Sequence, residues 1–540
     1  MKLKLKKLLG LAFAIAAIPL YSQEEGIKWG GYVKVDWFQD SRAVVASRDD
    51  MYIFYPAPRR QVTEAPAVIT DPQAKELYIL SNNQDLNAVP QAHITTVQSR
   101  VNLTATGPTA FGAKTSGFIE IDFFGTANHE AWMTRLRHAH ITLDWGATKL
   151  NAGMNWHPLF VAGYNPDTVQ FSPSPFHVLN RSPLVRLTQD LGGGLNLHLF
   201  AVYRAYHSEF AAPATSIPGA DGTITQTCTV TGAPGATCSV SPIPVYLTRP
   251  KRFASRPDID IQLEYKSDLF SGGITLDFNE IRLYPTVVSY DGVTRDVQIG
   301  NNKNKVNGFT WQIFGRINFD KENNGQIRFA YLNGENTSHL LMIGGYAEKR
   351  NFLLDNLGAL GVSPSDAALL RAFTLKEYTP VKIDAYWIQP IWGKSIEYSI
   401  ILGKTDNKGT KDDSVGVTIT TTGTPPTLTA SLATPYFARG TPTLKSATSI
   451  IPQVRFRSGK TWIGVMYGIF EAEYLEDDKG FRTIYQQIKR DAGIATGDYR
   501  VLKLDQFFIP DPTIISTKGV PQRTYKVTDR RIQVSIQHNI

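Results

Sequence analysis

Cysteine is nearly absent from this sequence: Cys228 and Cys238 are the only two in 540 residues. Two thiols cannot build a disulfide scaffold or a zinc module with four cysteine ligands. Charged residues are also scarce, at 19%, against about a quarter in ordinary soluble domains. The mean hydropathy is −0.19, and no segment beyond Leu20 offers the roughly 18 consecutive apolar residues of a membrane-spanning helix. A helical membrane protein is therefore excluded.

The N-terminus carries the one continuous apolar stretch. Residues 1–7 include four lysines, and residues 8–20 are apolar but too short to cross a bilayer. With the small residue Ser22 before the cut, the sequence predicts a signal peptide over residues 1–22 and a single mature domain over residues 23–540. Removing the leader lowers the formal charge from +8 to about +4, which gives no reason to expect a nucleic-acid partner. After export, Cys228 and Cys238 are expected to form a disulfide.

The rest of the chain alternates between apolar and polar residues. From Asp258 to Lys266, for example, every second residue is apolar and the others are polar or charged. Successive side chains of a strand point to opposite faces, so this pattern indicates strands that are wet on one side only. About sixteen such segments are predicted, at residues 27–38, 94–106, 114–125, 132–144, 149–156, 184–191, 195–206, 258–267, 272–285, 305–319, 326–334, 380–392, 395–406, 445–457, 461–473 and 524–540.

The connections alternate in length as well. The gap after every even strand is short, such as Gly146–Ala147, and the gap after most odd strands is long. A sheet in lipid must close so that no edge stays unpaired. The predicted fold is therefore all-β: a transmembrane antiparallel β-barrel of about sixteen strands, with short periplasmic turns and long extracellular loops. A soluble chain of several β-sandwiches is the alternative, but it does not explain the alternating gaps.

Several segments resemble DcaP-like porins, which are sixteen-stranded outer-membrane porins. The opening segment Gly31–Asp36 shows the resemblance, as do Arg135–Ala139, Leu150–Trp156 and Asn165–Phe171; Asp40–Arg42 and Tyr55–Pro56 resemble Bacteroidetes-type porins. Two features depart from the family pattern: an N-terminal coiled-coil heptad stretch is missing, and the last residue is Ile540 rather than an aromatic one. The resemblance implies a homotrimer in the outer membrane of a Gram-negative bacterium, in contact with its lipid.

In such porins the third long loop folds into the barrel and narrows it. Here that loop is predicted over residues 157–183 and carries five prolines, which stiffen it without allowing a strand or helix. Its alternative position is outside the barrel, exposed to the medium. Strand parity also predicts which charged residues line the inner wall. Basic residues near the two ends of the chain are expected to face acidic residues of the eighth and ninth strands across the barrel. The predicted pore-lining and constriction residues are Arg100, Glu120, Asp122, Asn165, Asp167, Asn180, Arg181, Arg186, Asp258, Asp260, Asp277, Arg316, Arg328, Arg455 and Arg531.

Enzymatic interpretations find little support. His138 and His140 could place two metal ligands on one strand face, but no third ligand is apparent. A Gly-x-Ser-x-Gly motif is absent from the sequence. We therefore expect no catalytic residues, no metal and no cofactor.

The predicted function is a porin for passive diffusion of small hydrophilic solutes. The alternatives are a surface adhesin or display barrel acting through its long outer loops, one of which has a predicted helix after Ser363, and, less favoured, a barrel hydrolase.

Overall fold

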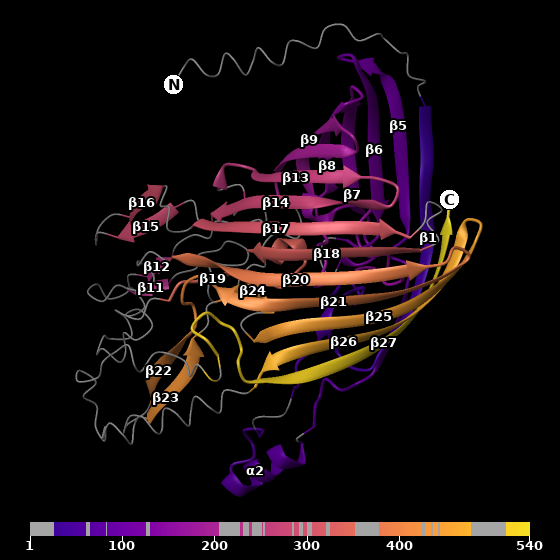
Figure 1. Ribbon diagram of the computed structural model, residues 1–540. Coiled ribbons are helices and arrows are strands. Elements are labelled where there is room, and N and C mark those ends of the chain that lie inside the picture. The colour runs from indigo at the N-terminus through magenta and orange to yellow at the C-terminus, as the bar shows by residue number, and fades with distance from the viewer. Residues whose placement is uncertain are drawn as a thin grey trace.

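The computed structural model shows a closed β-barrel (Figure 1). Sixteen long antiparallel strands form its wall, and three short strands add to the same sheet. The structure describes residues 26–60, 65–82, 84–125, 130–204, 227–229, 237–239, 251, 254–282, 286–290, 295–299, 305–319, 325–350, 377–422, 427–433, 436–440, 443–476, 513 and 515–540. The wall is closed by pairing of the first strand with the last, from Tyr32 opposite Asn539 to Asp40 opposite Arg531. The described residues contain no helix that is both long and apolar enough to cross a membrane.

Each of the sixteen segments predicted from the sequence corresponds to one strand of the wall. The predicted strand count is confirmed, and most boundaries agree within a few residues. In order around the barrel the strands are β1 (Gly26–Asp40), β5 (Arg100–Ala110), β6 (Ala113–Asp122), β7 (Arg135–Asp144), β8 (Thr148–Trp156), β9 (Arg181–Gly192), β10 (Leu195–Val202), β13 (Asp258–Lys266), β14 (Phe270–Arg282), β17 (Lys305–Asn318), β18 (Gly325–Glu335), β20 (Tyr378–Trp392), β21 (Ile396–Thr410), β25 (Leu444–Ser458), β26 (Thr461–Leu475) and β27 (Thr524–Asn539).

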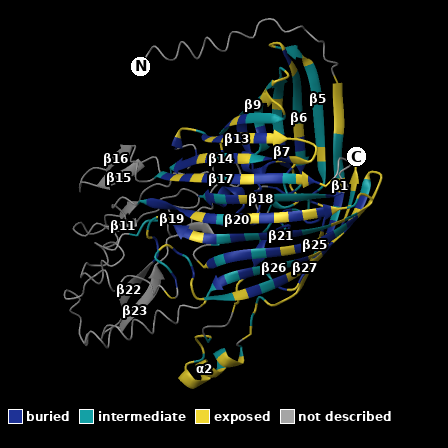
Figure 2. Cartoon of the chain, in the orientation of Figure 1, coloured by how far each residue is buried: buried dark blue, intermediate teal, exposed yellow. Residues whose placement is uncertain are grey.

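The two faces of the wall have the polarity of a membrane barrel. On β13 the side chains of Asp258 and Asp260 are fully buried, whereas Ile259 is 46% exposed. A similar alternation of buried with more exposed residues runs along β20, β26 and β27, among others (Figure 2). In a water-soluble protein the apolar residues would be the buried ones. Apolar residues outside and charged residues inside are stable together only where the outer surface meets lipid.

The short connections gather at one end of the barrel, where the C-terminus also lies (Figure 1). The backbone N–H of Ile540 donates to the carbonyl of Gly31 at 3.0 Å, which joins the two ends of the wall there. The long connections carry accessory elements: β2 (Val44–Ser47), β3 (Tyr52–Pro56), α2 (Pro72–Ser81), β4 (Gln91–Thr95), β11 (Thr227–Thr229), β12 (Thr237–Ser239), β15 (Thr286–Tyr290), β16 (Arg295–Ile299), β19 (Gly344–Glu348), β22 (Gly416–Thr422), β23 (Thr427–Ala433) and β24 (Tyr436–Arg439).

Helix α2 and the hairpin β2–β3 are among the elements that were not expected from the sequence. Helix α2 begins after Asp71, whose carboxylate accepts the N–H of Ala74 at 2.7 Å and so caps the helix. Strand β3 of the hairpin β2–β3 is buried, with Tyr52 and Phe54 at most 2% exposed, and it packs with the residues inside the barrel. The helix predicted after Ser363 lies outside the described residues.

Cys228 and Cys238 lie directly opposite each other on β11 and β12, an antiparallel two-stranded ribbon. A cross-strand disulfide requires this register, because the two β-carbons must approach within about 4.5 Å. The bond itself stays a prediction. The predicted signal peptide, residues 1–22, lies outside the described residues.

Candidate functional site: a loop inside the barrel

Residues 157–180, which we call the lumen loop, connect β8 to β9 along the inside of the wall. The loop begins with the short 3-10 helix η2 (Pro158–Phe160) and is otherwise irregular. Its apolar side chains are buried, among them Leu159, Val169 and Phe176. The sequence extended this loop to Pro183, but β9 already begins at Arg181.

The tip of the lumen loop is held by two glutamines of the wall. The backbone N–H of Asp167 donates to Oε1 of Gln389 at 2.8 Å, and Nε2 of Gln389 donates back to the Asp167 carbonyl at 2.7 Å. Gln453 donates to the same Asp167 carbonyl at 2.6 Å and accepts from the N–H of Val169, two residues further along, at 2.9 Å. A buried irregular backbone needs such partners, and the glutamines supply them from β20 and β25.

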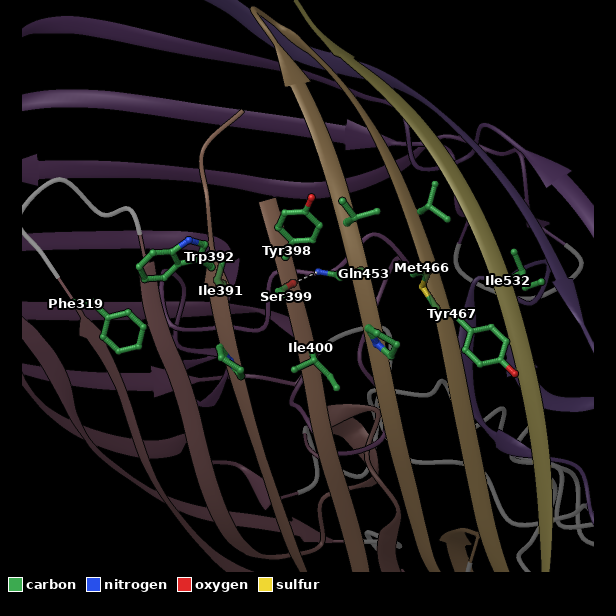
Figure 3. Close-up of a pocket in the computed structure, with 14 residues that line it drawn as sticks. Phe319, Ile391, Trp392, Tyr398, Ser399, Ile400, Gln453, Met466, Tyr467 and Ile532 are labelled. Atoms are coloured by element: carbon green, nitrogen blue, oxygen red, sulfur yellow. Dashed lines mark hydrogen bonds between the residues drawn. The ribbon is translucent and has the colours of Figure 1, made fainter. Parts of the chain in front are cut away.

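Both glutamines also donate to the hydroxyl of Ser399 on β21, which lies between them. Figure 3 shows Ser399 and Gln453 joined in this way beside a groove in the wall. The groove has a volume of about 890 Å³ and is lined mainly by apolar and aromatic side chains, including Trp392, Tyr398 and Tyr467, which are exposed on the outer face. It belongs to the outer surface, because the polar ends of the glutamines point to the loop on the other side.

Charged contacts reinforce the same anchor. The Asp167 carboxylate accepts from Nη1 of Arg455 at 2.5 Å, and Arg455 also contacts Glu397 at 3.1 Å. Burial raises the pKa of Asp167, but the charges of Arg455 and Arg328 outweigh it and hold the pKa below its usual value. Asp167 is therefore ionised at neutral pH. Nζ of Lys34 on β1 donates to the Val169 carbonyl at 2.8 Å.

Other parts of the lumen loop contact different strands. The Tyr164 hydroxyl donates to Glu264 on β13 at 2.9 Å, and Arg328 on β18 donates to the Asn165 carbonyl at 3.0 Å. Glycines make room for two of its side chains: a β-carbon at Gly403 would lie 2.5 Å from the Phe176 ring, and one at Gly464 would lie 2.8 Å from Val169. Contacts with β1, β13, β18, β20, β21, β25 and β26 are possible for one loop only if it crosses the interior of the barrel.

A cluster of buried ion pairs lies near the root of the lumen loop. Arg137 donates to Glu120 at 2.6 Å and to Asp122 at 2.7 Å, and Arg135 donates to Asp122 at 3.0 and 2.7 Å. The Tyr52 hydroxyl of hairpin β2–β3 accepts from Arg135 at 3.3 Å. The cluster therefore ties two neighbouring strands to the hairpin inside the barrel.

Strand parity leaves the direction of Arg135 and Arg137 ambiguous, and the parity that they share with Ile141 favours an outward one. The structure corrects this expectation: Arg137 is 0% exposed and faces the interior. The reason is a β-bulge: Glu120 pairs with His138, but Ile121 pairs with Leu136, so Arg137 is an extra residue. One inserted residue reverses the facing of every residue before it.

The remaining predicted pore residues all lie on inward positions of the wall or in the lumen loop, and most already have a partner. Arg531 pairs with Asp40 at 2.6 Å, and Asp258 pairs with Arg204 at 3.0 Å and with Lys251. Arg100 lies 3.9 Å from Glu120. Other predicted residues contact aromatic rings or the backbone. Arg181 lies over the ring of Trp156, Arg316 lies over the ring of Tyr164, and Asn180 donates to the His339 carbonyl. Arg186 is half-buried on β9.

The basic and acidic groups predicted on opposite sides of the barrel lie on the expected strands, but their charges are largely matched locally. Sequence reasoning missed the residues that match them, such as Asp40 and Glu397, and it missed Gln389, Gln453 and Ser399. One signal was present: each glutamine adjoins a proline within a strand, Gln389–Pro390 and Pro452–Gln453. Proline inside a strand removes a ladder hydrogen bond and marks a special position.

The histidine pair considered as a metal site does not gather further ligands. Nδ1 of His140 lies 2.9 Å from the amide of Asn151, and the rings of His138 and His140 are 6.2 Å apart. Among the described residues, neither belongs to a group of three potential ligands.

No protein-family model matches the chain, and no curated protein matches it in sequence. Among solved structures it is similar to the outer membrane channel DcaP of Acinetobacter baumannii, with a TM-score of 0.52 and 12% identity over 97% of this chain and 100% of that chain. The chain has the fold of that channel. The resemblance predicted from sequence is thus confirmed at the level of the fold. The anion-selective porin from Comamonas acidovorans also aligns, with a TM-score of 0.46 and 10% identity over 96% of this chain and 100% of that chain.

Proposed function

We propose that the protein is an outer-membrane porin through which small hydrophilic solutes diffuse passively, and that the lumen loop forms its constriction. The observation that carries this proposal is the anchoring of Asp167 to Gln389, Gln453 and Arg455 on the far side of the barrel from the loop's own strands. A sixteen-stranded barrel encloses an aqueous lumen. A loop fixed across that lumen sets the size of solute that passes.

The polarity of the lumen supports diffusion of hydrophilic solutes. Charged and amide side chains line the interior, whereas the outer face is apolar. The paired charges leave little net field, so we expect weak ion selectivity. The hairpin β2–β3 narrows the lumen further, next to the ion-pair cluster of Arg135 and Arg137. We infer that the protein has no catalytic activity, resides in the outer membrane of a Gram-negative bacterium and assembles as a homotrimer, as the family resemblance implies.

Deleting Pro166–Pro175 tests the constriction. Removing these ten residues cuts the anchored tip, so the single-channel conductance in planar bilayers should rise several-fold. A matched control deletes Pro72–Ser81, which forms helix α2, is also ten residues long and has no buried residue. The control should conduct like the intact protein.

Heat-modifiable migration on gels confirms that each deletion variant still forms a barrel. If the Pro166–Pro175 variant folds and conducts no more than the intact protein, the lumen loop is not the constriction. Failure of the intact protein to form channels at all would overturn the porin proposal itself.

A further inference from the structure

Two aspartates inside the barrel stand out because neither forms an ion pair with any described residue. Asp260 and Asp277 are directly opposite each other on β13 and β14, and both are 0% exposed. Among the described residues, neither carboxylate oxygen of Asp260 has a hydrogen-bond partner. One oxygen of Asp277 has a partner, because the amide of Asn279 donates to it at 2.8 Å, and the other has none. Burying two carboxylates without compensation costs several kcal/mol for each charge.

The two nearby cations act on the pair only from a distance, because their own ion pairs are with another residue. Lys251 and Arg204 both contact Asp258, and Lys251 additionally donates to the Glu280 carbonyl. No described ion pair reaches Asp260 or Asp277. The two acidic side chains therefore face each other without a cation in direct contact among the described residues.

A third side chain is directed at the same place from the lumen loop. His157 is 1% exposed, and its Nε2 has no partner among the described residues. One ligand atom from each of His157, Asp260 and Asp277 can be chosen so that all three lie within 4.8 Å of one another. A neutral imidazole is a metal ligand, and an unpartnered one this deeply buried is an observation independent of the acidic pair.

We propose that His157, Asp260 and Asp277 bind one divalent transition-metal ion, of the Zn²⁺ or Mn²⁺ type. Two carboxylates neutralise the charge of a divalent ion, and the imidazole favours these metals over Ca²⁺ and Mg²⁺. Metal–ligand bonds of about 2.0–2.2 Å place neighbouring ligand atoms roughly 3–4 Å apart, which small side-chain adjustments reach from the observed spacing. Solvent completes the coordination shell.

Binding changes the hydrogen bonding of His157. Nδ1 of His157 accepts the N–H of Leu159 at 3.3 Å, so the neutral ring carries its proton on Nε2. A metal at Nε2 requires the lone pair there and moves the ring proton to Nδ1. Metal binding therefore breaks the hydrogen bond from the Leu159 N–H to Nδ1. This bond is long, so losing it costs little free energy.

The ion would join the lumen loop to the wall at the loop's root. His157 is the first residue of the loop, and η2 lies against β14. The tip is fastened separately by Gln389 and Gln453. A metal at the root would thus hold the second end of the same segment, and this role does not depend on which solute the barrel passes.

Equilibrium dialysis of the untagged, folded protein in detergent tests the proposal. After chelator treatment, the protein is dialysed against Zn²⁺, Mn²⁺ or Ca²⁺ alone, and bound metal is counted by mass spectrometry. We expect one equivalent of Zn²⁺ or Mn²⁺ per chain, bound more tightly than Ca²⁺. The variant Asp260→Asn/Asp277→Asn should lose this equivalent, and His157→Phe should weaken Zn²⁺ binding about tenfold or more.

The matched control is Glu264→Gln, which removes a carboxylate from the inward face of the same strand. Glu264 contacts His198 at 3.1 Å and accepts the Tyr164 hydroxyl of the lumen loop at 2.9 Å. A glutamine oxygen still accepts that hydroxyl and Glu264 is not part of the acidic pair, so this variant should bind metal like the intact protein. Replacing Cys228 and Cys238 by serine in every sample removes the thiols as competing ligands. Heat-modifiable migration verifies folding.

Two results would overturn the proposal. One is the absence of saturable Zn²⁺ or Mn²⁺ binding by the folded protein, which would mean that the two carboxyl groups share a proton instead. The other is an equivalent of bound metal that survives in the folded Asp260→Asn/Asp277→Asn variant. Channel conductance plays no part in either readout, so failure here leaves the porin proposal untouched.

Discussion

Asp167 and Gln389, 222 residues apart in sequence, exchange two hydrogen bonds: the backbone of one and the side-chain amide of the other each donate and accept. A glutamine amide reproduces the donor and acceptor of a neighbouring strand. The lumen loop is thereby fastened as a strand would be, without belonging to the sheet. Gln453 repeats the arrangement from β25.

Replacing both glutamines by leucine should release the loop tip. The buried backbone groups of Asp167 and Val169 would lose four hydrogen bonds in all, each worth about 1 kcal/mol. We expect higher single-channel conductance with larger current fluctuations. Gln262→Leu is the control, because Gln262 donates to Thr275 on the neighbouring strand and not to the loop. Equal current traces for the double variant and the control would contradict the anchoring role.

Reversing the charge of Arg100 and Arg455 should shift selectivity toward cations. Replacement by glutamate removes two positive charges from the lumen and adds two negative ones, which attract cations and repel anions. Reversal potentials across a salt gradient measure the shift. Lys460→Glu, an equal charge reversal in the short exposed turn between β25 and β26, serves as control. If the reversal potential shifts as much in the Lys460→Glu control as in the double variant, the ion selectivity is not set by charges inside the lumen.

Acid should loosen the lumen loop through His177. Its ring is buried against Phe160 and Trp387, and burial lowers its pKa to about 3, whereas the ordinary value is about 6.5. The neutral ring therefore contributes its full stability above pH 6.5. Below it the contribution falls by about 1.4 kcal/mol per pH unit until pH 3.

Channel recordings between pH 7 and pH 4 measure this effect. The variant His177→Phe keeps an apolar ring that cannot be protonated, and it should show a smaller change in conductance across that range. His157 and His339 are also buried with lowered pKa values, so some acid response should persist. If the two proteins respond identically, His177 does not govern the loop.

Arg137→Leu should destabilise the barrel strongly. The change leaves Glu120 without its closest cation and Asp122 with one arginine instead of two, and removing one partner of a buried pair costs about 3–5 kcal/mol. Lys149→Leu is the comparison, because the half-exposed Lys149 pairs with Asp144 near a turn and such pairs contribute about 0–1 kcal/mol. Urea unfolding in detergent, followed by tryptophan fluorescence, gives both free energies. Similar losses for the two variants would mean that the buried cluster adds no stability.

Much of the wall was predictable from local pattern, and the interior was not. The alternation along β13 shows which residues face lipid, because each strand residue has only two possible directions. The bulge at Arg137 breaks that rule without any sign in the sequence. The route of the lumen loop depends on Gln389 and Gln453, which lie more than 200 residues away. The prolines of the loop predict a stiff irregular segment, but only the packed structure shows which strands the segment contacts.

Barrel closure has a consequence for assembly. The ion pair between Asp40 and Arg531 joins residues 491 positions apart, and the neighbouring Ser41 accepts the N–H of Arg530. Neither contact can form before nearly the whole chain has crossed the inner membrane. Until then the partial sheet has two open edges, which invite pairing with other chains. Folding dominated by such distant contacts is slow. The chain must therefore be shielded from aggregation in transit, until its last strand reaches its first.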